Sequence, residues 1–245
     1  MSNGLQFAVS YVYARNLSNE GGVAPTAFAG EYGGSPTSRF DPGYSLDYGN
    51  VIYTRRNRFL ATFVYDLPLG KGKVLGTNAN GVLDRIIGGW ELAGVLLFQT
   101  GPFLTVTVPA ADPSGTGFPN LYQNGRADIV SGQPLYSANQ SISHWINPSA
   151  FAVPPNNVGR FPSAPVGDVV GPGTQAVSIS MFKAVTIQEH VRLQVGASAA
   201  NLFNHPNYSA PNTTFNTPQF GTISSLQSAE GAGPRALQLG ARLTF

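Results

Sequence analysis

The sequence predicts an all-β protein: an antiparallel transmembrane β-barrel segment of about six long strands, with long extracellular loops and short periplasmic turns. Apolar and polar residues alternate with a period of two in six segments, as the two faces of a strand require. These segments are longer than soluble strands, which average about 5–6 residues. Charged residues make up only 11% of the 245-residue chain, whereas soluble domains contain about 25%.

The alternating runs are about 8–12 residues long, close to the length that a tilted strand needs to cross a bilayer. They place the six strands near residues 5–14, 57–67, 90–106, 176–183, 190–203 and 235–245. No apolar run is long enough for a transmembrane helix.

The alternation assigns each strand a lipid-facing side and a lumen-facing side. Residues predicted to face lipid are Leu5, Phe63, Leu96, Leu193 and Leu239. Residues predicted to face the lumen are Gln6, Thr62, Glu91, Gln194 and Arg242. We expect all six strands to form one antiparallel meander, because each shows the same two-sided pattern.

Aromatic residues lie near the ends of several apolar faces. They are Tyr11, Tyr13, Tyr65, Trp90 and Phe98. Outer-membrane barrels carry girdles of aromatic residues at both membrane interfaces. These five residues are therefore the candidate aromatic girdle.

The connections between the predicted strands alternate between long and short. The first, third and fifth are long and rich in Gly, Pro, Ser and Asn, whereas the fourth is only "AVTIQE". Outer-membrane barrels have short periplasmic turns and long extracellular loops, so the last strand should end on the periplasmic side. The segment "NANGVLDRIIGG" could form one helical turn, and we expect the long loops to fold back on themselves.

Motifs that carry chemistry are absent from the sequence. There are no cysteines, and the three histidines, His144, His190 and His205, are widely separated, so neither a metal site nor a bound cofactor is expected. "GKGKVLG" lacks the spacing of a nucleotide-binding loop, and Asp128 and Asp168 are best explained as turn residues. We expect no enzymatic activity.

The basic residues do not suggest a nucleic-acid partner. The chain carries a net charge of +2, and its only basic cluster is Arg55, Arg56 and Arg58. This cluster is most simply a solvated strand end and loop. The alternative to a barrel segment is a secreted, soluble β-sandwich that acts as a binding module, in which the aromatic residues face a core.

Several phrases resemble a known family when they are taken together and in order. They are "RRNRFLATFVYDLPLGKGK", "GGWELAGVLLFQTGPFLTV", "HWINPSAF", "QEHVRLQVGASAANLFNHPNY" and "PRALQLGARLTF". This set resembles the C-terminal end of TonB-dependent outer-membrane receptors, in particular the Oar-like subgroup with a carboxypeptidase-regulatory-like domain. The resemblance extends from about Arg55 to Phe245.

The resemblance implies a cell outer-membrane location and a 22-stranded barrel that takes part in TonB-energised uptake of a large or scarce substrate. Residues 1–245 would form the C-terminal portion of this barrel. We expect the plug, the TonB box, the signal peptide and the N-terminal strands of such a receptor to lie outside this chain. TonB would then act only through the missing plug, while lipid and the missing strands would be direct partners.

The last predicted strand ends in a patterned terminus. Apolar residues at alternate positions lead to a terminal aromatic residue: Leu237, Leu239, Ala241, Leu243 and Phe245. This pattern resembles the signal that the barrel-assembly machinery reads. A lipid-facing strand must have its backbone groups paired, so a strand of this kind suits addition to an existing sheet edge.

Overall fold

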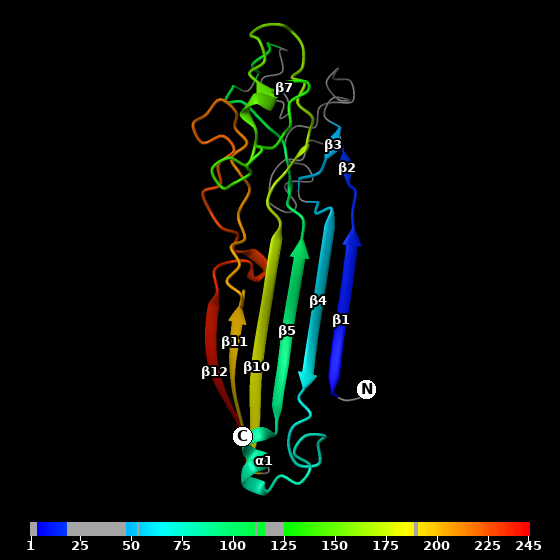
Figure 1. Ribbon diagram of the computed structural model, residues 1–245, viewed down its shortest axis with the longest axis vertical. Helices are drawn as coiled ribbons and strands as arrows, with labels where there is room; N and C mark the ends of the chain where they lie inside the picture. The colour runs from blue at the N-terminus through cyan, green and yellow to red at the C-terminus, as the bar shows by residue number, and fades with distance from the viewer. Residues whose placement is uncertain (1–3, 19–47, 53, 111, 116–124, 189–190) are drawn as a thin grey trace.

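A computed structural model describes the chain apart from residues 1–3, 19–47, 53, 111, 116–124 and 189–190. Its main feature is a six-stranded antiparallel sheet, tall and narrow, with loops above one end (Figure 1). The strands are β1 (Leu5–Tyr13), β4 (Asn57–Asp66), β5 (Trp90–Gln99), β10 (Thr174–Gln188), β11 (Val191–Ala200) and β12 (Ala236–Thr244). They lie in the order β1-β4-β5-β10-β11-β12, which confirms the predicted meander.

The strand register brings all the predicted lipid-facing residues to one face. Phe7 lies opposite Phe63, Phe63 opposite Gly94, and Gly94 opposite Ile179. Ile179 in turn lies opposite Ala199 on β11, which pairs with Leu237 on β12. Because directly opposed residues share a face, the alternations of the six strands join into one apolar face and one polar face.

Two predicted boundaries are wrong. The strand expected over 90–106 ends at Gln99, and Phe103–Leu104 forms a separate short strand, β6, that pairs with β9 (Val169–Val170). Pro102 lies at this break, and proline cannot donate a ladder hydrogen bond. The segment "AVTIQE", expected to be a turn, continues β10 to Gln188 because it pairs with β11 there.

Strands β1 and β12 are the two edges of the sheet, and within the described residues the sheet does not close into a barrel. Each of the nine residues in either strand is exposed. The expectation of 22 strands comes only from the family resemblance and stays a prediction.

The connection between β4 and β5 contains the one α-helix of the described residues, α1 (Gly81–Ile87). The Asn80 side chain caps it by accepting a hydrogen bond from the Leu83 amide at 2.8 Å, as an N-cap residue does. No helix in the described part of the chain is long and apolar enough to cross a membrane.

The loops at the other end form a packed layer, which we call the cap: the described residues of 101–173 and 204–226. It contains β6 and β9, and a second pair of short strands, β7 (Asp128–Ile129) and β8 (Phe151–Ala152). Beside it, β2 (Leu17–Ser18) pairs with β3 (Gly49–Asn50). The buried core of the cap consists of Leu104, Val106, Val108, Ala127, Ile146, Ala150, Phe151, Ala164 and Val169. The described residues of the third and fifth connections therefore fold on themselves, as predicted, whereas most of the first connection lies outside the described residues.

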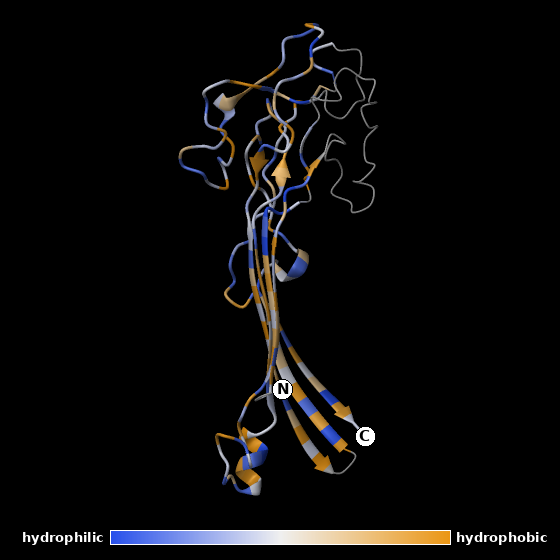
Figure 2. Cartoon of the chain, turned by 90° about the vertical axis from the view of Figure 1, so that its right-hand side faces the viewer, coloured by the Kyte–Doolittle hydropathy of each residue, from blue (hydrophilic) through white to orange (hydrophobic). Residues whose placement is uncertain are grey.

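The described residues also contain two 3-10 helices. Pro148–Ala150 (η2) lies in the cap, and Ala229–Gly231 (η3) lies in the connection between β11 and β12. Figure 2, which views the sheet from its edge, shows η3 and α1 on opposite sides of the sheet.

Candidate functional site

The apolar face of the sheet is an exposed hydrophobic surface. Phe7, Val9, Leu237 and Leu239 are all more than half exposed. A continuous apolar surface of this extent is rare on soluble monomers, where it marks a site of contact with another apolar phase.

The five candidate girdle residues all lie on this apolar face. Tyr11, Tyr13 and Phe98 are near the cap end, and the Phe98 ring lies 6.2 Å from that of Phe59. Tyr65 and Trp90 are near the other end of their strands. The structure therefore brings these residues into two bands, one toward each end of the sheet.

One cation, Lys183, interrupts the apolar face. It lies opposite Trp90 in the register and is almost fully buried. Its ammonium group donates to the Gly88 carbonyl and lies 5.2 Å from the centre of the Trp90 ring. A carbonyl and an aromatic face thus solvate a charge that would otherwise be costly on an apolar surface.

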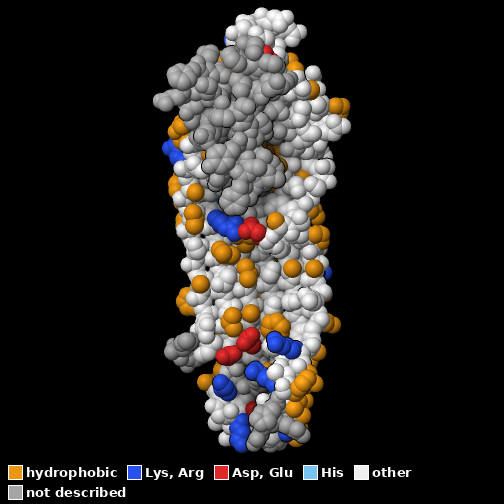
Figure 3. Space-filling view, turned by 180° about the vertical axis from the view of Figure 1, so that it is seen from behind, with side chains coloured by type: hydrophobic (Ala, Val, Ile, Leu, Met, Phe, Trp, Pro, Cys, Tyr) orange, Lys and Arg blue, Asp and Glu red, His pale blue; other side chains and the backbone are white. Residues whose placement is uncertain are grey.

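The opposite face carries all five residues that were predicted to face the lumen. Viewed from behind, charged side chains gather below the loops and again near the lower end (Figure 3). In the register of this face, Asp66 lies directly opposite Glu91, whereas Arg192 and Arg242 are on β11 and β12. Acidic and basic groups therefore occupy neighbouring parts of the same polar wall.

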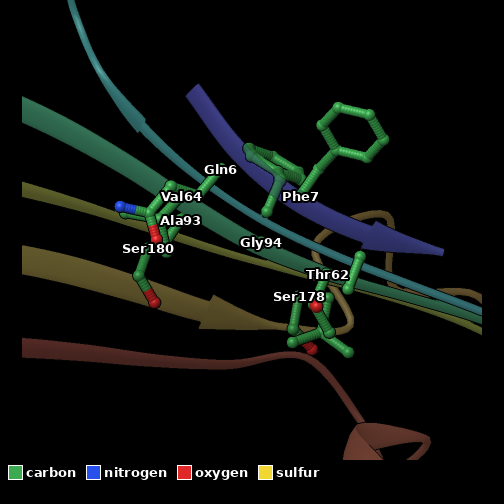
Figure 4. Close-up of a pocket in the computed structure, with 11 residues that line it drawn as sticks. Gln6, Phe7, Thr62, Val64, Ala93, Gly94, Ser178 and Ser180 are labelled. Carbon is green, nitrogen blue, oxygen red and sulfur yellow. The ribbon is translucent and has the colours of Figure 1, made fainter. Parts of the chain in front are cut away.

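Between the charged ends lies a shallow hollow of about 460 Å³. Its polar lining comes from Gln6, Thr62, Ser178 and Ser180, which belong to the three strands β1, β4 and β10 (Figure 4). The remaining lining is small or apolar and includes Ala93 and Gly94. This surface offers neutral hydrogen-bonding groups without a nucleophile–base pair.

A short segment folds over the cap end of the polar face. We call it the inner loop, residues 227–233, and it contains η3. Its Ala232 packs with Leu97 and Ala176 of the sheet. Glu230 forms an ion pair with Arg58 at 2.5 Å, and Gln227 accepts a hydrogen bond from Thr174 at 2.8 Å.

Two asparagines hold the inner loop from the other side. The Asn207 amide group donates to the Ala232 carbonyl at 3.0 Å, and that of Asn201 donates to Gly233 at 2.8 Å. Both asparagines are almost fully buried, so their hydrogen bonds satisfy backbone groups that burial would otherwise leave costly. The inner loop is therefore fastened to the wall.

The basic cluster is more than a solvated strand end. Arg58 pairs with Glu230, and Arg56 stacks over the Phe103 ring at 5.0 Å and donates to the Asn50 side chain at 3.1 Å. Arg55 donates to the Ile52 carbonyl at 3.4 Å. The sequence prediction was wrong because two of these partners, Glu230 and Phe103, come from distant parts of the chain.

Electrostatics at this end of the wall follow from the ion pair. The hydrogen bond from Arg58 is the main reason that the pKa of Glu230 lies below its ordinary value. Burial lowers the pKa of the Arg55 guanidinium, partly offset by attraction to Glu230. Glu230 is thus charged at neutral pH, and it faces two arginines.

The prediction that Asp128 is a turn residue is also wrong, because Asp128 lies in strand β7. Its carboxylate forms an ion pair with Arg160 at 2.5 Å and accepts a hydrogen bond from the Ser163 amide at 2.9 Å. The bond from Arg160 is the main cause of its lowered pKa. Asp168 is exposed and lies between a turn at residues 166–167 and strand β9.

The remaining sequence candidates are dispersed. His144 and His205 lie in the cap, whereas His190 falls outside the described residues. Within the described residues, no group of three His, Asp or Glu side chains could hold a metal ion. The C-terminal residues 237, 239, 241 and 243 lie on the apolar face of the edge strand β12, and Phe245 follows it, 92% exposed.

Sequence reasoning missed the contacts of Lys183, Glu230 and Asn207. The unusual position of a lysine on an apolar face was visible in the alternation of strand β10. No local pattern marked Glu230 or Asn207, because their partners are more than twenty residues away.

Comparison with known families agrees with this two-faced sheet. No curated protein and no solved structure matches the chain. The outer membrane beta barrel domain, however, matches residues 1–238, which include five of the six long strands in full and most of their loops. The chain therefore belongs to the family of outer membrane beta barrel domains.

Proposed function

We propose that this outer-membrane protein forms part of the wall of a TonB-dependent receptor that takes up a large or scarce substrate, and that it has no enzymatic activity of its own. One observation carries the proposal. A continuous apolar face for lipid is backed by a continuous polar face, and the inner loop and the cap stand over its upper end. Resemblance to the C-terminal end of the Oar-like receptors supplies the finer assignment.

In this role, the cap and inner loop face the outside of the cell and the α1 end faces the periplasm. The polar wall and its hollow would line the substrate path. Lipid contacts the other face, between the two aromatic bands. The barrel-assembly machinery would recognise the terminal strand through its alternate apolar residues and Phe245.

The two unpaired edges of the sheet, β1 and β12, support the proposal that a closed barrel needs further strands. The smallest single-chain barrels have about eight strands, and an unpaired backbone group in hydrocarbon costs several kcal/mol. In the proposed receptor, β1 and β12 pair with strands beyond this six-stranded sheet, and the plug transmits the pull of TonB.

A soluble sandwich is the competing assignment. It needs a second sheet over the apolar face, whereas the other sheets of the described residues are two-stranded and belong to the loops (Figure 1). Membrane fractionation separates the two. A barrel wall should require detergent for extraction, and release by a salt wash would favour the sandwich.

The receptor role is tested by measurements of pore formation, substrate uptake and contact with TonB. Six strands alone should give no stable pore in planar bilayers and no TonB-dependent uptake. When the chain is part of a complex that includes a plug, the complex should crosslink to TonB in the host envelope. A defined monomeric channel formed by this chain alone would contradict the proposal.

A further inference from the structure

The connection between β4 and β5, residues 67–89, presents its apolar side chains outward. Val82 and Ile86, one helical turn apart on α1, are 72% and 62% exposed. Asp84 instead turns inward, where it accepts a hydrogen bond from the Lys71 amide at 2.5 Å. A helix on the surface of a soluble protein has the opposite arrangement, with its polar stripe toward the solvent.

The same connection exposes further apolar residues. Val74 is 82% exposed and Leu75 is 57% exposed. Inside the connection, only the small Ala79 is a fully buried apolar residue, and backbone hydrogen bonds hold the segment together: the Gly70 amide donates to the Leu75 carbonyl at 2.9 Å, and the Gly88 amide donates to the Asp84 carbonyl at 2.8 Å. The exposed apolar side chains therefore do not belong to a hydrophobic core within the connection.

The C-terminal end of α1 is fastened to the apolar side of the sheet. Trp90, on the apolar face of β5, donates from its indole nitrogen to the Ile86 carbonyl at 3.2 Å. Lys183, on the apolar face of β10, donates to the Gly88 carbonyl. Figure 2 shows α1 on the side of the sheet opposite to η3, and the loop that contains η3 packs on the polar face. The exposed residues of α1 therefore adjoin the lower aromatic band, which contains Tyr65 and Trp90.

The charges of this connection are mostly positive. Lys71, Lys73 and Arg85 are exposed, and Asp84 is the only acidic residue in 67–89. Basic residues beside exposed apolar ones are typical of segments that lie in the interface of an anionic membrane.

We propose that α1 and the exposed residues of 67–89 lie in the headgroup layer of the periplasmic leaflet, and that the lipids contacted are phospholipids with anionic headgroups. The apolar side chains enter the acyl boundary, and Lys71, Lys73 and Arg85 contact phosphate groups. The inference rests on the proposed orientation of the barrel, because it assigns the α1 end to the periplasm.

Lipid is favoured over a periplasmic protein by two observations. The exposed residues of α1 continue the apolar face, through Trp90, on the side that a bilayer covers in a barrel of this family. The positive charge also complements anionic headgroups. A peptide-binding groove would require facing walls, whereas Val82 and Ile86 project from a single helix.

The test uses single cysteines, which are simple to introduce because the chain has none. Nitroxide labels at Ile86→Cys, Leu96→Cys and Asn78→Cys are placed in the full chain, within its native outer membrane and in vesicles of phosphatidylethanolamine and phosphatidylglycerol. Leu96 reports on the sheet, and Asn78, exposed in the same connection, is the matched polar control. The ratio of oxygen to nickel-complex accessibility is measured at each label.

We expect the ratio at Ile86 to be several-fold higher than at Asn78 in both membranes, and lower than at Leu96. A low ratio at Ile86 with a high ratio at Leu96 would overturn the inference alone. Low ratios at both would overturn the proposed barrel wall. Protection of Ile86 from both reagents, in the native membrane only, would identify a protein partner and also overturn the inference.

The charge component has a separate measurement. When phosphatidylglycerol is replaced by phosphatidylcholine, the ratio at Ile86 should fall toward that at Asn78. A double substitution, Lys71→Gln with Lys73→Gln, should weaken this dependence on lipid charge, because of the three basic residues only Arg85 remains. Equal ratios in both lipids for the otherwise unchanged protein would contradict the role of the basic residues.

Discussion

The six-stranded sheet and the cap use similar residues in opposite places. In the sheet, most of the large apolar side chains lie on the outward face, where they can be highly exposed, as Leu239 is at 84%. In the cap they point inward, as Ile146 does at 1%. The cap follows the ordinary rule for a protein in water, whereas the sheet obeys the rule for a wall in lipid, where backbone pairing holds the structure together.

The two regions therefore depend on different interactions. The cap has a packed core with an aromatic cluster, in which the rings of Phe215 and Phe220 meet edge to face at 5.2 Å. The sheet has continuous ladders on both sides of its four inner strands. We expect core truncations to affect the cap, and charges on the apolar face to affect the sheet.

The largest effect should come from Phe151→Ala in the cap. Phe151 is buried and contacts Phe220, with ring centres 6.0 Å apart. Loss of a buried phenylalanine costs about 3–5 kcal/mol, so the cap should open while the sheet remains folded. Protease cleavage of intact outer membranes measures this opening.

The matched control for Phe151 is Phe203→Ala. Phe203 is exposed, and exposed substitutions usually change stability by less than about 0.5 kcal/mol. Equal cleavage of the two variants would show that the core of the cap does not hold it closed.

The next effect distinguishes the two faces of the sheet at adjacent positions. Leu96→Arg places a charge on the apolar face and should destabilise the folded protein by about 2–4 kcal/mol if it lies near the bilayer centre. Val95→Arg places the same charge in the hollow of the polar face, where water can solvate it. Denaturant titration in lipid compares them, and equal midpoints would refute the face assignment.

A smaller effect should separate two glycines that face each other across β11 and β12. Gly196 lies beneath the Phe182 ring, and a methyl group there would overlap it, whereas Gly240 has open space. Gly196→Ala should cost about 1–3 kcal/mol, as overpacking does, and Gly240→Ala should have little effect. Denaturation midpoints measure the stability change of each variant. Similar losses of stability in the two variants would mean that the substitution acts through the backbone and not through overlap with the Phe182 ring.

The smallest effect concerns pH and the cap. Because Arg160 lowers the pKa of Asp128 in the folded state from 3.8, the pair contributes stability in full above that value. The contribution is lost as pH falls below it and through the lowered pKa. Arg160 is half exposed, so the loss should be at most about 1 kcal/mol.

The contribution of the Asp128–Arg160 pair is measured by the rate at which an acid-tolerant protease cleaves the cap, from about pH 5 to about pH 2. Asp128→Asn should be less stable above the transition and should lack this contribution to the pH dependence. An unchanged profile in that variant would show that another carboxylate governs the acid response.

Much of the sheet could be predicted from the sequence because a period of two is a local property. The faces of Leu5 and Gln6 follow from alternation alone, and all six strands show it. Strand ends were less predictable, since β5 stops before Pro102 and β10 continues through "AVTIQE" only because β11 pairs with it. The aromatic bands followed from the same alternation.

The sequence by itself determined the two-faced strands, their order in the meander and the direction in which each side chain points. Only the tertiary structure decided the core of the cap, the pairing of Arg58 with Glu230 and the outward turn of the apolar residues on α1. The reason is physical. A side chain's face depends on its own strand, whereas an ion pair between residues 172 positions apart depends on how distant loops return to the sheet.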